Sequence, residues 1–343
     1  MRAAVLEGPR SLRVEERPIP DPGPADVVLK VNTCGVCGTD SHIYQGEFLV
    51  RFPVVPGHEL SGEVVEVGSS VTHVAVGDWV TVDPNIVCGV CPYCRVGQIN
   101  LCDNLHAVGV RMDGGFAGYC RAPAKQVYRL PEGMSLLEGA FAEPLACCLH
   151  GTDRAGLRAG DRVLVIGGGS IGLTMVQLAL AAGASHVILS EPSESRRGLG
   201  VVLGATAALN PVATDVRGEV LELTEGGADL VIECAGTART AEQAVACARK
   251  GGRVLFFGVA PEAAIAELRP YDIFLRELTI LGSFVNPFTH QRALEALAKG
   301  RVKVEPLVSH RYPVAAFEEA LAMSRSPQAV KVVVQPSLEE AAV

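Results

Sequence analysis

The chain has 343 residues, of which 48% are hydrophobic and 20% charged, and its formal net charge is −8. This is a globular composition, long enough for two domains, and it has no cluster of Lys and Arg that would favour a nucleic-acid partner. No apolar run approaches the ~20 residues of a membrane-spanning helix, and the N-terminus lacks the apolar core of a secretion signal. We therefore expect no membrane partner and a cytoplasmic location.

The order of predicted elements divides the chain. Roughly the first 130 residues alternate short Val-rich runs with turn signals, which predicts an irregular β-rich domain. Residues 135–156 have apolar positions at helical spacing, with Glu143-Pro144 inside. Residues 162–184 read as a buried strand, a glycine turn and a long apolar helix. Further strands are predicted at 186–191, 228–236, 251–260 and 278–284, with helices at 195–205, 241–251, 290–302 and 314–325.

Strands that alternate with helices predict a parallel sheet covered on both faces. The predicted fold class is therefore α/β, a doubly wound parallel sheet joined to a β-rich domain. We place the dinucleotide-binding domain at 149–285 and a discontinuous metal-binding domain at 1–148 and 286–343.

A glycine turn follows the first strand of the parallel sheet. Gly167, Gly169 and Gly172 fit G-x-G-x-x-G, where a tight turn lets the backbone approach a pyrophosphate at a helix N-terminus. Glu191 ends the next strand, and a carboxylate there accepts hydrogen bonds from the ribose hydroxyls of NAD and repels the 2′-phosphate of NADP. Arg196 and Arg197 leave NADP open, because a nearby arginine can receive that phosphate.

Eleven cysteines are many for a chain expected in the cytosol, and four of them are tightly spaced. Cys88, Cys91, Cys94 and Cys102 read C-x2-C-x2-C-x7-C. Four thiolates at this spacing can surround one zinc ion and leave no open position, which is typical of a structural site. An iron–sulfur cluster is the alternative for such a spacing.

A second group of polar residues has the composition of a catalytic zinc site, which takes three protein ligands and keeps one position open. Cys37 and His58 supply a thiolate and an imidazole, and either Glu59 or Glu143 can supply a carboxylate. Adjacent side chains in a β-like segment face opposite sides, so the geometry favours Glu143 as the ligand with Glu59 behind the metal. The other assignment stays open.

Five motifs then occur in the order found in one family: residues 34–44, 56–68, 88–102, 141–151 and 165–173. Over nearly its whole length the chain resembles the zinc-containing medium-chain alcohol and polyol dehydrogenases, in the branch of sorbitol, butanediol and threonine dehydrogenases. The resemblance implies a GroES-like catalytic domain, a Rossmann domain, NAD, two zinc ions per chain, and a homotetramer or, failing that, a homodimer.

The resemblance also implies residue roles. Asp40 resembles the acid that orients the histidine ligand, while Thr39 and His42 resemble a proton relay. In relatives one of the two carboxylates binds the metal and the other lies behind it. The positions that match the NAD site are Ile171, Glu191, Arg196, Phe257, Gly258, Val259, Ser283 and Phe284. At two places the chain departs from sorbitol dehydrogenases: Ile43 replaces a tyrosine, and Val285-Asn286 replaces an Arg-Tyr pair that binds polyol hydroxyls.

Together these features predict a zinc-dependent dehydrogenase that moves a hydride between a secondary alcohol and NAD in a cleft between the domains. A sugar alcohol or small diol is the favoured substrate. The alternatives are a threonine dehydrogenase-like activity on an amino alcohol, a zinc-free reductase with the same fold, and an NAD-binding protein without enzymatic activity.

Overall fold

The computed structural model describes residues 1–47 and 50–338. The chain forms two compact units. The first contains Met1–Ala146, Asn286–Gly300 and the chain from Val304 onward, and the second contains Cys147–Val285 and Arg301–Lys303. Among the described residues, no helix combines the length and apolarity that crossing a membrane requires.

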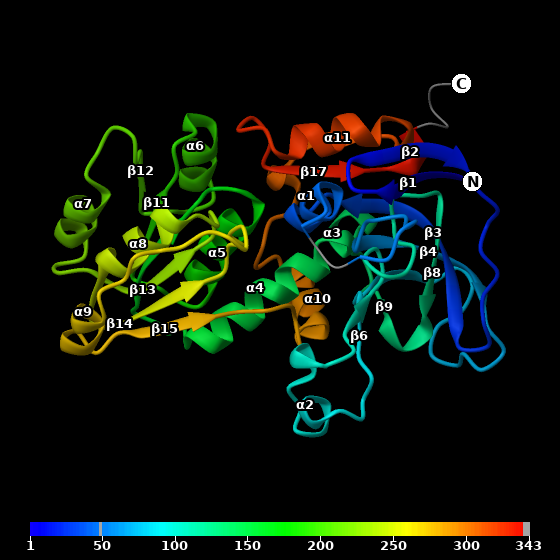
Figure 1. The fold of residues 1–343 in the computed structure, drawn as a ribbon, viewed down its shortest axis with the longest axis horizontal. Coiled ribbons are helices and arrows are strands. Elements are labelled where there is room, and N and C mark those ends of the chain that lie inside the picture. Colours follow the sequence, from blue (N-terminus) through cyan, green and yellow to red (C-terminus); the bar gives the residue numbers. More distant parts are fainter. Residues whose placement is uncertain (48–49, 339–343) are drawn as a thin grey trace. The chain divides into compact units, whose positions relative to one another are not determined.

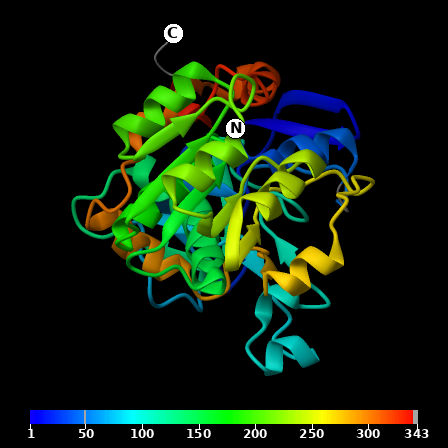
Figure 2. The ribbon, with the colours of Figure 1, turned by 90° about the vertical axis from the view of Figure 1, so that its left-hand side faces the viewer.

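The second unit is built on a parallel sheet (Figures 1 and 2). Its strands follow the order β12 (Ala207–Leu209), β11 (His186–Ser190), β10 (Arg162–Ile166), β13 (Ala228–Glu233), β14 (Ala248–Phe256) and β15 (Thr279–Gly282). The helices are α5 (Ser170–Ala181), α6 (Glu194–Val202), α7 (Val216–Leu223), α8 (Ala238–Cys247) and α9 (Pro270–Leu275). The predicted α/β fold with a doubly wound parallel sheet is confirmed.

Alternate residues of the central strands face opposite layers of helices. Ile188 belongs to an apolar cluster with Val220 of α7 and Val245 of α8. The next residue, Leu189, faces the other way, where a Cβ on Gly200 of α6 would meet its side chain. Both Ile188 and Leu189 are fully or almost fully buried. Burial of both faces explains why these strands are continuous apolar runs instead of alternating ones.

Two helix predictions are corrected by the structure. The helix expected over 241–251 ends at Cys247, because Ala248 pairs with Ala228 at the start of β14. The helical stretch 135–156 is divided at Phe141 into α3 (Leu136–Ala140) and α4 (Ala142–Ala155). This division puts Pro144 in the first turn of α4, where a missing backbone N–H costs no helical hydrogen bond.

The first unit is rich in β-structure, as predicted. Its main sheet follows the order β16 (Val308–Tyr312), β17 (Lys331–Val334), β3 (Asp26–Gly35), β4 (Glu59–Val67), β5 (Trp79–Val82) and β9 (Val127–Arg129), and β8 (Tyr119–Pro123) also pairs with β3. Smaller pairs join β1 (Arg2–Gly8) to β2 (Ser11–Glu16) and β6 (Asn85–Ile86) to β7 (His106–Ala107).

Besides α3, this unit contains the helices α1 (Gly38–Gln45), α2 (Pro92–Arg95), α10 (His290–Ala298) and α11 (Phe317–Ser324). Its core joins segments that are distant in the sequence. Phe116 and Phe317 are both fully buried, and their ring centroids lie 4.3 Å apart. The C-terminal strand β17 pairs antiparallel with β3 and parallel with β16. The last strand of the chain is thereby part of the sheet that carries the candidate metal site.

Candidate active site

Helix α1 starts at the candidate metal ligand Cys37, which is its N-cap residue. The backbone N–H of Cys37 donates to Asp40 Oδ2 over 2.8 Å, and this contact fixes the first turn. Asp40 is buried, while Thr39 and His42 are both half-buried. Residues three apart share one helix face, so Thr39 and His42 can act on the same groups. Thr39 Oγ1 lies 3.7 Å from Cys37 Sγ.

Strand β4 brings two further candidate ligands beside Cys37. Its first residue, Glu59, pairs with Gly35 of β3, two residues before Cys37. One ligand atom each from Cys37, His58 and Glu59 lie within 4.8 Å of one another. His58 Nδ1 is 3.7 Å from Asp40 Oδ1, which leaves Nε2 of the ring for a metal. The resemblance implied that Asp40 orients the histidine ligand, and this role stays a prediction, because 3.7 Å exceeds a hydrogen-bond distance.

The second candidate carboxylate also reaches the site. Glu143 lies in the first turn of α4 and is 7% exposed. Its negative charge acts on His58 and on Lys331, raising the pKa of both groups. The cluster of ligand atoms within 4.8 Å contains Glu59 and does not include Glu143, whose charge nevertheless acts on His58 and Lys331.

The buried charges of this site suit a divalent cation. Burial raises the pKa of Asp40 to about 6, although His58 and the Cys37 N–H oppose the shift. Burial would lower the pKa of His58, but Cys37, Asp40 and Glu143 together raise it well above its usual value. Several anionic groups thus surround the imidazole of His58 and the ammonium of Lys331. A zinc ion between Cys37 and His58 would supply the countercharge, and its thiolate, imidazole and carboxylate donors match the known ligand set of catalytic zinc.

One charged group at this site was missed by the sequence analysis. Lys331, the first residue of β17, forms an ion pair with Glu59 Oε2, and the two side chains are only 4% and 2% exposed. Burial lowers the pKa of Lys331, but the charges of Glu59 and Cys37 outweigh this and raise it. The available signal was a lysine opening the apolar run Val332–Val334, where a buried strand end needs a partner for its charge.

The relay candidate His42 also has a partner that the sequence analysis did not name. His42 Nδ1 lies 2.7 Å from Glu47 Oε2 just beyond the end of α1. This contact occupies one ring nitrogen and leaves Nε2 available for a proton. Ile43, which stands where sorbitol dehydrogenases have a tyrosine, is fully buried in an apolar cluster and does not line the site.

The four-cysteine segment has the geometry of a closed metal site. All four sulfur atoms lie within 4.8 Å of one another. Four sulfurs around a zinc ion with Zn–S bonds of ~2.3 Å would be ~3.8 Å apart, so only a small contraction is needed. Backbone N–H groups point at the sulfurs: Cys88 N donates to Cys102 Sγ over 3.3 Å, and Cys91 N donates to Cys88 Sγ over 3.3 Å. Hydrogen bonds from Val90 and Cys91 lower the pKa of the Cys88 thiol to about 6. Burial raises the pKa of the Cys94 thiol to about 12, so without a metal ion the four thiols do not all favour the thiolate form.

In the second unit the glycine turn has the shape that phosphate binding requires. Gly167 has a φ of +100°, which favours glycine. A Cβ on Gly172 would meet the carbonyl of Gly167, so helix and strand approach closely there. A Cβ on Gly169, the N-cap of α5, would meet nothing within 4 Å. The loop is therefore tightly packed at two glycines and open at the third. Ile171 follows it and is half-buried.

Glu191 lies directly beside this loop. Gly168 N donates to Glu191 Oε2 over 2.6 Å, and Ser193 N donates to Oε1 over 2.8 Å. The carboxylate is 3% exposed and follows the carboxyl end of β11. Arg196 is half-buried in α6, and Arg197 donates to the carbonyl of Glu191 over 2.9 Å. Arg197 is thus committed to the backbone at this position.

The remaining predicted cofactor positions follow strand ends. Phe257, Gly258 and Val259 come after β14, and Ser283 and Phe284 come after β15. The sequence analysis missed a residue that organises this edge. Glu233 ends β13 and accepts hydrogen bonds from Ala235 N and Gly236 N, each over 2.8 Å. Its backbone carbonyl accepts from Phe257 N and Gly258 N, so Glu233 holds two cofactor-side turns together.

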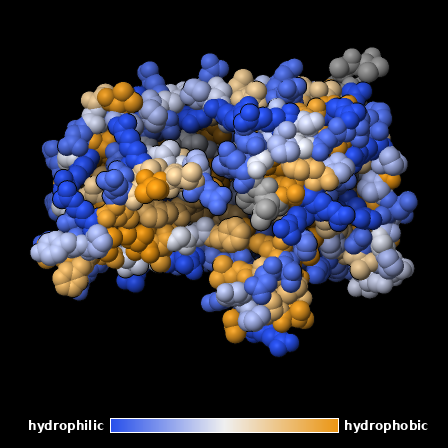
Figure 3. All heavy atoms as spheres, viewed as in Figure 1, coloured by the Kyte–Doolittle hydropathy of each residue, from blue (hydrophilic) through white to orange (hydrophobic). Residues whose placement is uncertain are grey.

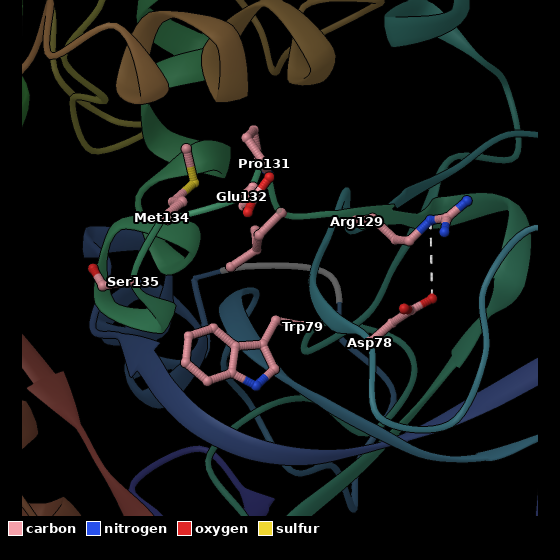
Figure 4. Close-up of a pocket in the computed structure, with 9 residues that line it drawn as sticks. Asp78, Trp79, Arg129, Pro131, Glu132, Met134 and Ser135 are labelled. Carbon is pink, nitrogen blue, oxygen red and sulfur yellow. Dashed lines mark ion pairs between the residues drawn. The ribbon is translucent and has the colours of Figure 1, made fainter.

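A hollow of about 420 Å³ opens elsewhere on the first unit (Figure 4). Trp79, Arg129, Glu132 and Met134 are among its lining residues, and an Asp78–Arg129 ion pair of 3.9 Å lies at its edge. No residue of the predicted metal or cofactor sites lines this hollow. We do not place the reaction there.

Asn286 occupies one of the two positions where the sorbitol dehydrogenases carry their polyol-binding pair. It is 1% exposed, and its amide oxygen accepts a hydrogen bond from Asn85. Its amide nitrogen is buried and has no hydrogen-bond partner among the described residues. The amide oxygen is therefore engaged inside the first unit, whereas the amide nitrogen is not.

A thiolate–imidazole–carboxylate cluster, a closed four-cysteine site and a dinucleotide fold together define a metal-dependent nicotinamide oxidoreductase. Comparison with known proteins agrees. Residues 23–132 match the alcohol dehydrogenase GroES-like domain, and residues 170–299 match the zinc-binding dehydrogenase domain. The chain belongs to the zinc-binding alcohol dehydrogenase family, and it is a zinc-dependent oxidoreductase of alcohols or polyols that uses a nicotinamide cofactor.

Two curated relatives match nearly the whole chain. An L-threonine 3-dehydrogenase of Pyrococcus furiosus is 37% identical over 92% of this chain and 92% of its own length. D-arabinitol dehydrogenase 1 of Uromyces fabae is 33% identical over 98% and 97%, respectively. Both belong to the substrate branch that the sequence motifs indicated.

Solved structures are similar over the same extent. A Sinorhizobium meliloti 1021 protein described as a zinc-binding dehydrogenase and bound to NADP has a TM-score of 0.94 and 45% identity, covering 98% of this chain and 99% of that one. An Escherichia coli CFT073 alcohol dehydrogenase in complex with NADH has a TM-score of 0.91 and 32% identity, with the same coverage. The GroES-like and Rossmann domains expected from the resemblance are confirmed.

Proposed function

We propose that this protein oxidises the secondary alcohol group of a small polyol or diol and transfers the hydride to NAD. The observation that carries the proposal is the cluster of Cys37, His58 and Glu59, whose ligand atoms lie within 4.8 Å of one another beside buried Asp40. Metal-free reduction would not require a cysteine and a buried histidine beside each other at this place. A protein that only bound NAD would not require it either.

In the proposed site, Cys37, His58 and Glu143 hold the catalytic zinc, and Glu59 stands behind it. Cys88, Cys91, Cys94 and Cys102 hold a second, structural zinc. Membership of a zinc-binding family favours zinc over an iron–sulfur cluster at the four cysteines. When bound, the catalytic zinc stabilises negative charge on the substrate oxygen as a Lewis acid.

The chain's own residues then position groups and move a proton. Asp40 orients the His58 ring through Nδ1. Thr39 Oγ1 accepts a hydrogen bond from the substrate hydroxyl and hands its proton towards His42. His42 accepts at Nε2, because Nδ1 is bonded to Glu47. Gly167, Gly169 and Gly172 would form the turn that holds the pyrophosphate, and Phe257, Gly258, Val259, Ser283 and Phe284 would line the nicotinamide half of the cofactor.

We propose NAD as the preferred cofactor. The buried Glu191 carboxylate at the end of β11 favours a free ribose over a 2′-phosphate. Solved relatives with NADH and with NADP show that the family uses both cofactors. In this chain Arg197 donates to backbone carbonyls beside Glu191, which reduces its capacity to receive a phosphate.

An amino alcohol is the second candidate substrate, since threonine dehydrogenases are as similar to the chain as polyol dehydrogenases are. Because Val285-Asn286 stands in place of the Arg-Tyr pair and the Asn286 amide oxygen already accepts from Asn85, we infer that the alcohol is not recognised as it is in sorbitol dehydrogenases. We propose a small-molecule alcohol in the cytoplasm as the physiological substrate, to be identified with a substrate panel.

The deciding experiment combines metal analysis with that panel. The purified protein should contain two zinc ions per chain. It should reduce NAD with at least one of sorbitol, xylitol, arabitol, mannitol, 2,3-butanediol and threonine. One zinc per chain and no activity on any alcohol would refute the proposal. Activity on threonine alone would select the amino-alcohol candidate.

We also propose a homotetramer, with a homodimer as the alternative. β15 is the last strand of the parallel sheet, so one of its edges lacks a partner strand among the described residues. Exposed apolar side chains such as Tyr271, Phe274 and Leu275 belong to the preceding helix α9, and Figure 3 shows hydrophobic side chains gathered over this region. Unpaired strand edges with apolar surroundings are typical of subunit interfaces. Light scattering at micromolar concentration should give a tetramer or dimer, and a monomer would contradict this assignment.

A further inference from the structure

The candidate catalytic site contains a buried lysine for which the zinc and relay assignments have no use. Lys331 opens β17, and Glu59 opens β4. Both strands pair with β3 at the same residue, because Gly35 is opposite Val333 on one side and opposite Glu59 on the other. This arrangement brings the Lys331 ammonium to Glu59 Oε2, although the two residues are far apart in the chain.

The fold leaves space for this pair and excludes water from it. Gly35 lies beside both side chains, and a Cβ at this position would come within 2.8 Å of Lys331 Cε and would also collide with Glu59. The Lys331 ammonium lies 5.9 Å from the centre of the Phe141 ring. The two side chains are 4% and 2% exposed. Removing one partner of such a pair leaves a buried charge that must find another partner.

The nearest alternative partner for Glu59 is the catalytic metal. A Glu59 oxygen already lies within 4.8 Å of the ligand atoms of Cys37 and His58. A modest rotation of the carboxylate would therefore bring it into the coordination sphere. In a catalytic zinc site, that additional ligand would occupy the position that the substrate oxygen needs.

We propose that Lys331 is a positioning residue that holds Glu59 off the catalytic metal and so keeps a coordination position open for the alcohol. The inference rests on the proposed zinc site. Within that site the two carboxylates have separate roles. Glu143 binds the metal, and the Lys331 ammonium of β17 keeps Glu59 from binding it. Lys331 itself touches neither substrate nor cofactor.

The proposal is tested by the rate at which a chelator removes the catalytic zinc. Lys331→Met keeps the length of the side chain and removes its charge. We expect the catalytic zinc to leave about 10-fold more slowly than from the parent, because Glu59 joins the metal, and kcat to fall by about 10-fold or more, within the range known for groups that orient metal ligands. A Cys37→Ala variant identifies which of the two zinc-release phases belongs to the catalytic site.

Three variants control for other causes. Lys331→Arg retains the charge and should behave like the parent in zinc release. Lys331→Met combined with Glu59→Gln replaces the ion pair with neutral groups. If Lys331 acts through Glu59, the lysine substitution should change zinc release by less than about two-fold in that background, within ordinary additivity. Lys30→Met makes the same change at an exposed position of β3 and should leave both readouts unchanged.

The result that overturns the proposal is zinc release from Lys331→Met as fast as or faster than from the parent. The same holds if the lysine substitution has an equal effect in the Glu59→Gln background. If Lys331→Met does not fold, the other two variants still test the proposal. If only the charge of Lys331 matters, both Lys331→Arg and Lys331→Met combined with Glu59→Gln must release zinc as rapidly as the parent. Failure of the proposed function would look different, since the parent itself would then lack the second zinc.

Discussion

The two candidate metal sites of the first unit are built in opposite ways. The four cysteines lie between residues 88 and 102, are held by backbone N–H groups of the same segment, and use short elements such as α2 and η1 (Ile99–Leu101). The other site collects Cys37 and Asp40 from α1, His58 and Glu59 at the start of β4, Glu143 from α4 and Lys331 from β17. The first site is local in the sequence, and the second depends on the whole fold of the unit.

This difference has a chemical consequence. A four-thiolate site is complete by itself and leaves no open position, so it stabilises structure. The distributed site has more acidic groups than a zinc ion needs, together with a buried ammonium. The additional carboxylate and the ammonium allow one ligand to replace another at the metal or to be kept away from it. A catalytic site uses such exchange, and a structural site does not.

The largest expected effect separates the two carboxylates. Glu143→Ala should retain the structural zinc, lose much of the catalytic zinc and lower kcat/KM by more than about 100-fold, because a direct ligand is removed. Glu59→Ala should keep more of the zinc and lose about 10–100-fold in activity. Metal analysis and steady-state kinetics on both proteins check this.

The opposite ranking of zinc content would assign the ligand role to Glu59. Two zinc ions and full activity in both variants would mean that the catalytic site is elsewhere. Glu138→Ala is a matched control, since this glutamate caps the neighbouring helix α3 and carries no proposed role in the chemistry.

The two sites also differ in how far the sequence predicts them. The spacing of the four cysteines alone indicates their common site, because residues so close in the chain can meet without knowledge of the fold. The parallel sheet and its glycine turn were predicted for a similar reason: strand, turn and helix are adjacent. Lys331 was missed because its contact with Glu59 depends on β17 pairing with β3 in one particular register. No local pattern contains that information.

The boundary errors have the same origin. Residues 248–250 are compatible with a helix by composition, yet the pairing of Ala248 with Ala228 begins β14 there, and residues 248–251 all belong to that strand. Glu59 and Glu143 remained competitors because their distances from Cys37 and His58 are set by contacts between strands and by the start of α4. In both cases tertiary contacts decided what local propensity left open.

Substitution of a cysteine in the four-cysteine site should lower the stability of the protein more than its catalytic rate. Cys94→Ser should lower Tm by roughly 5–10 °C, since losing a structural zinc costs several kcal/mol and each kcal/mol shifts Tm by about 2–4 °C in a domain of this size. The kcat of the surviving protein should fall much less. Cys147→Ser, at a half-buried cysteine outside the site, is the control. An unchanged Tm would contradict the assignment of the four cysteines to a structural zinc site.

The next smaller effect is expected for the preference between NAD and NADP. Glu191→Ala should narrow the preference for NAD over NADP in kcat/KM by about 10-fold or more, because hydrogen bonds to a charged group contribute about 1.5–3 kcal/mol. The ratio is the informative quantity, since loss of the contact with Gly168 loosens the loop for both cofactors. Glu194→Ala, at the first residue of α6, is the matched control. Equal use of both cofactors by the parent would show that the role of Glu191 is wrong.

The smallest expected effect concerns a buried imidazole that belongs to neither metal site. His290 is 1% exposed, its ring lies 4.8 Å from that of Tyr128, and neither ring nitrogen has a hydrogen-bond partner among the described residues. Burial lowers the pKa of His290 to about 3. Below about pH 6.5 His290 is protonated in the unfolded chain but stays neutral in the folded protein. The free energy of unfolding therefore falls as the pH is lowered.

For this one group the loss between pH 7.5 and pH 5 should be about 2 kcal/mol, from a difference of about 1.4 kcal/mol per pH unit. His290→Phe retains a ring against Tyr128 and cannot titrate, so its stability should fall less over the same interval. Urea unfolding followed by Trp79, the single tryptophan of the chain, reports on the unit that contains His290. Other groups contribute too, and burial gives Asp40 a pKa of about 6 with the opposite sign, but they act equally in both proteins and cancel in the comparison. Parallel pH profiles for parent and variant would mean that His290 is hydrated or paired in solution, and a dry environment for this imidazole would then be an incorrect description.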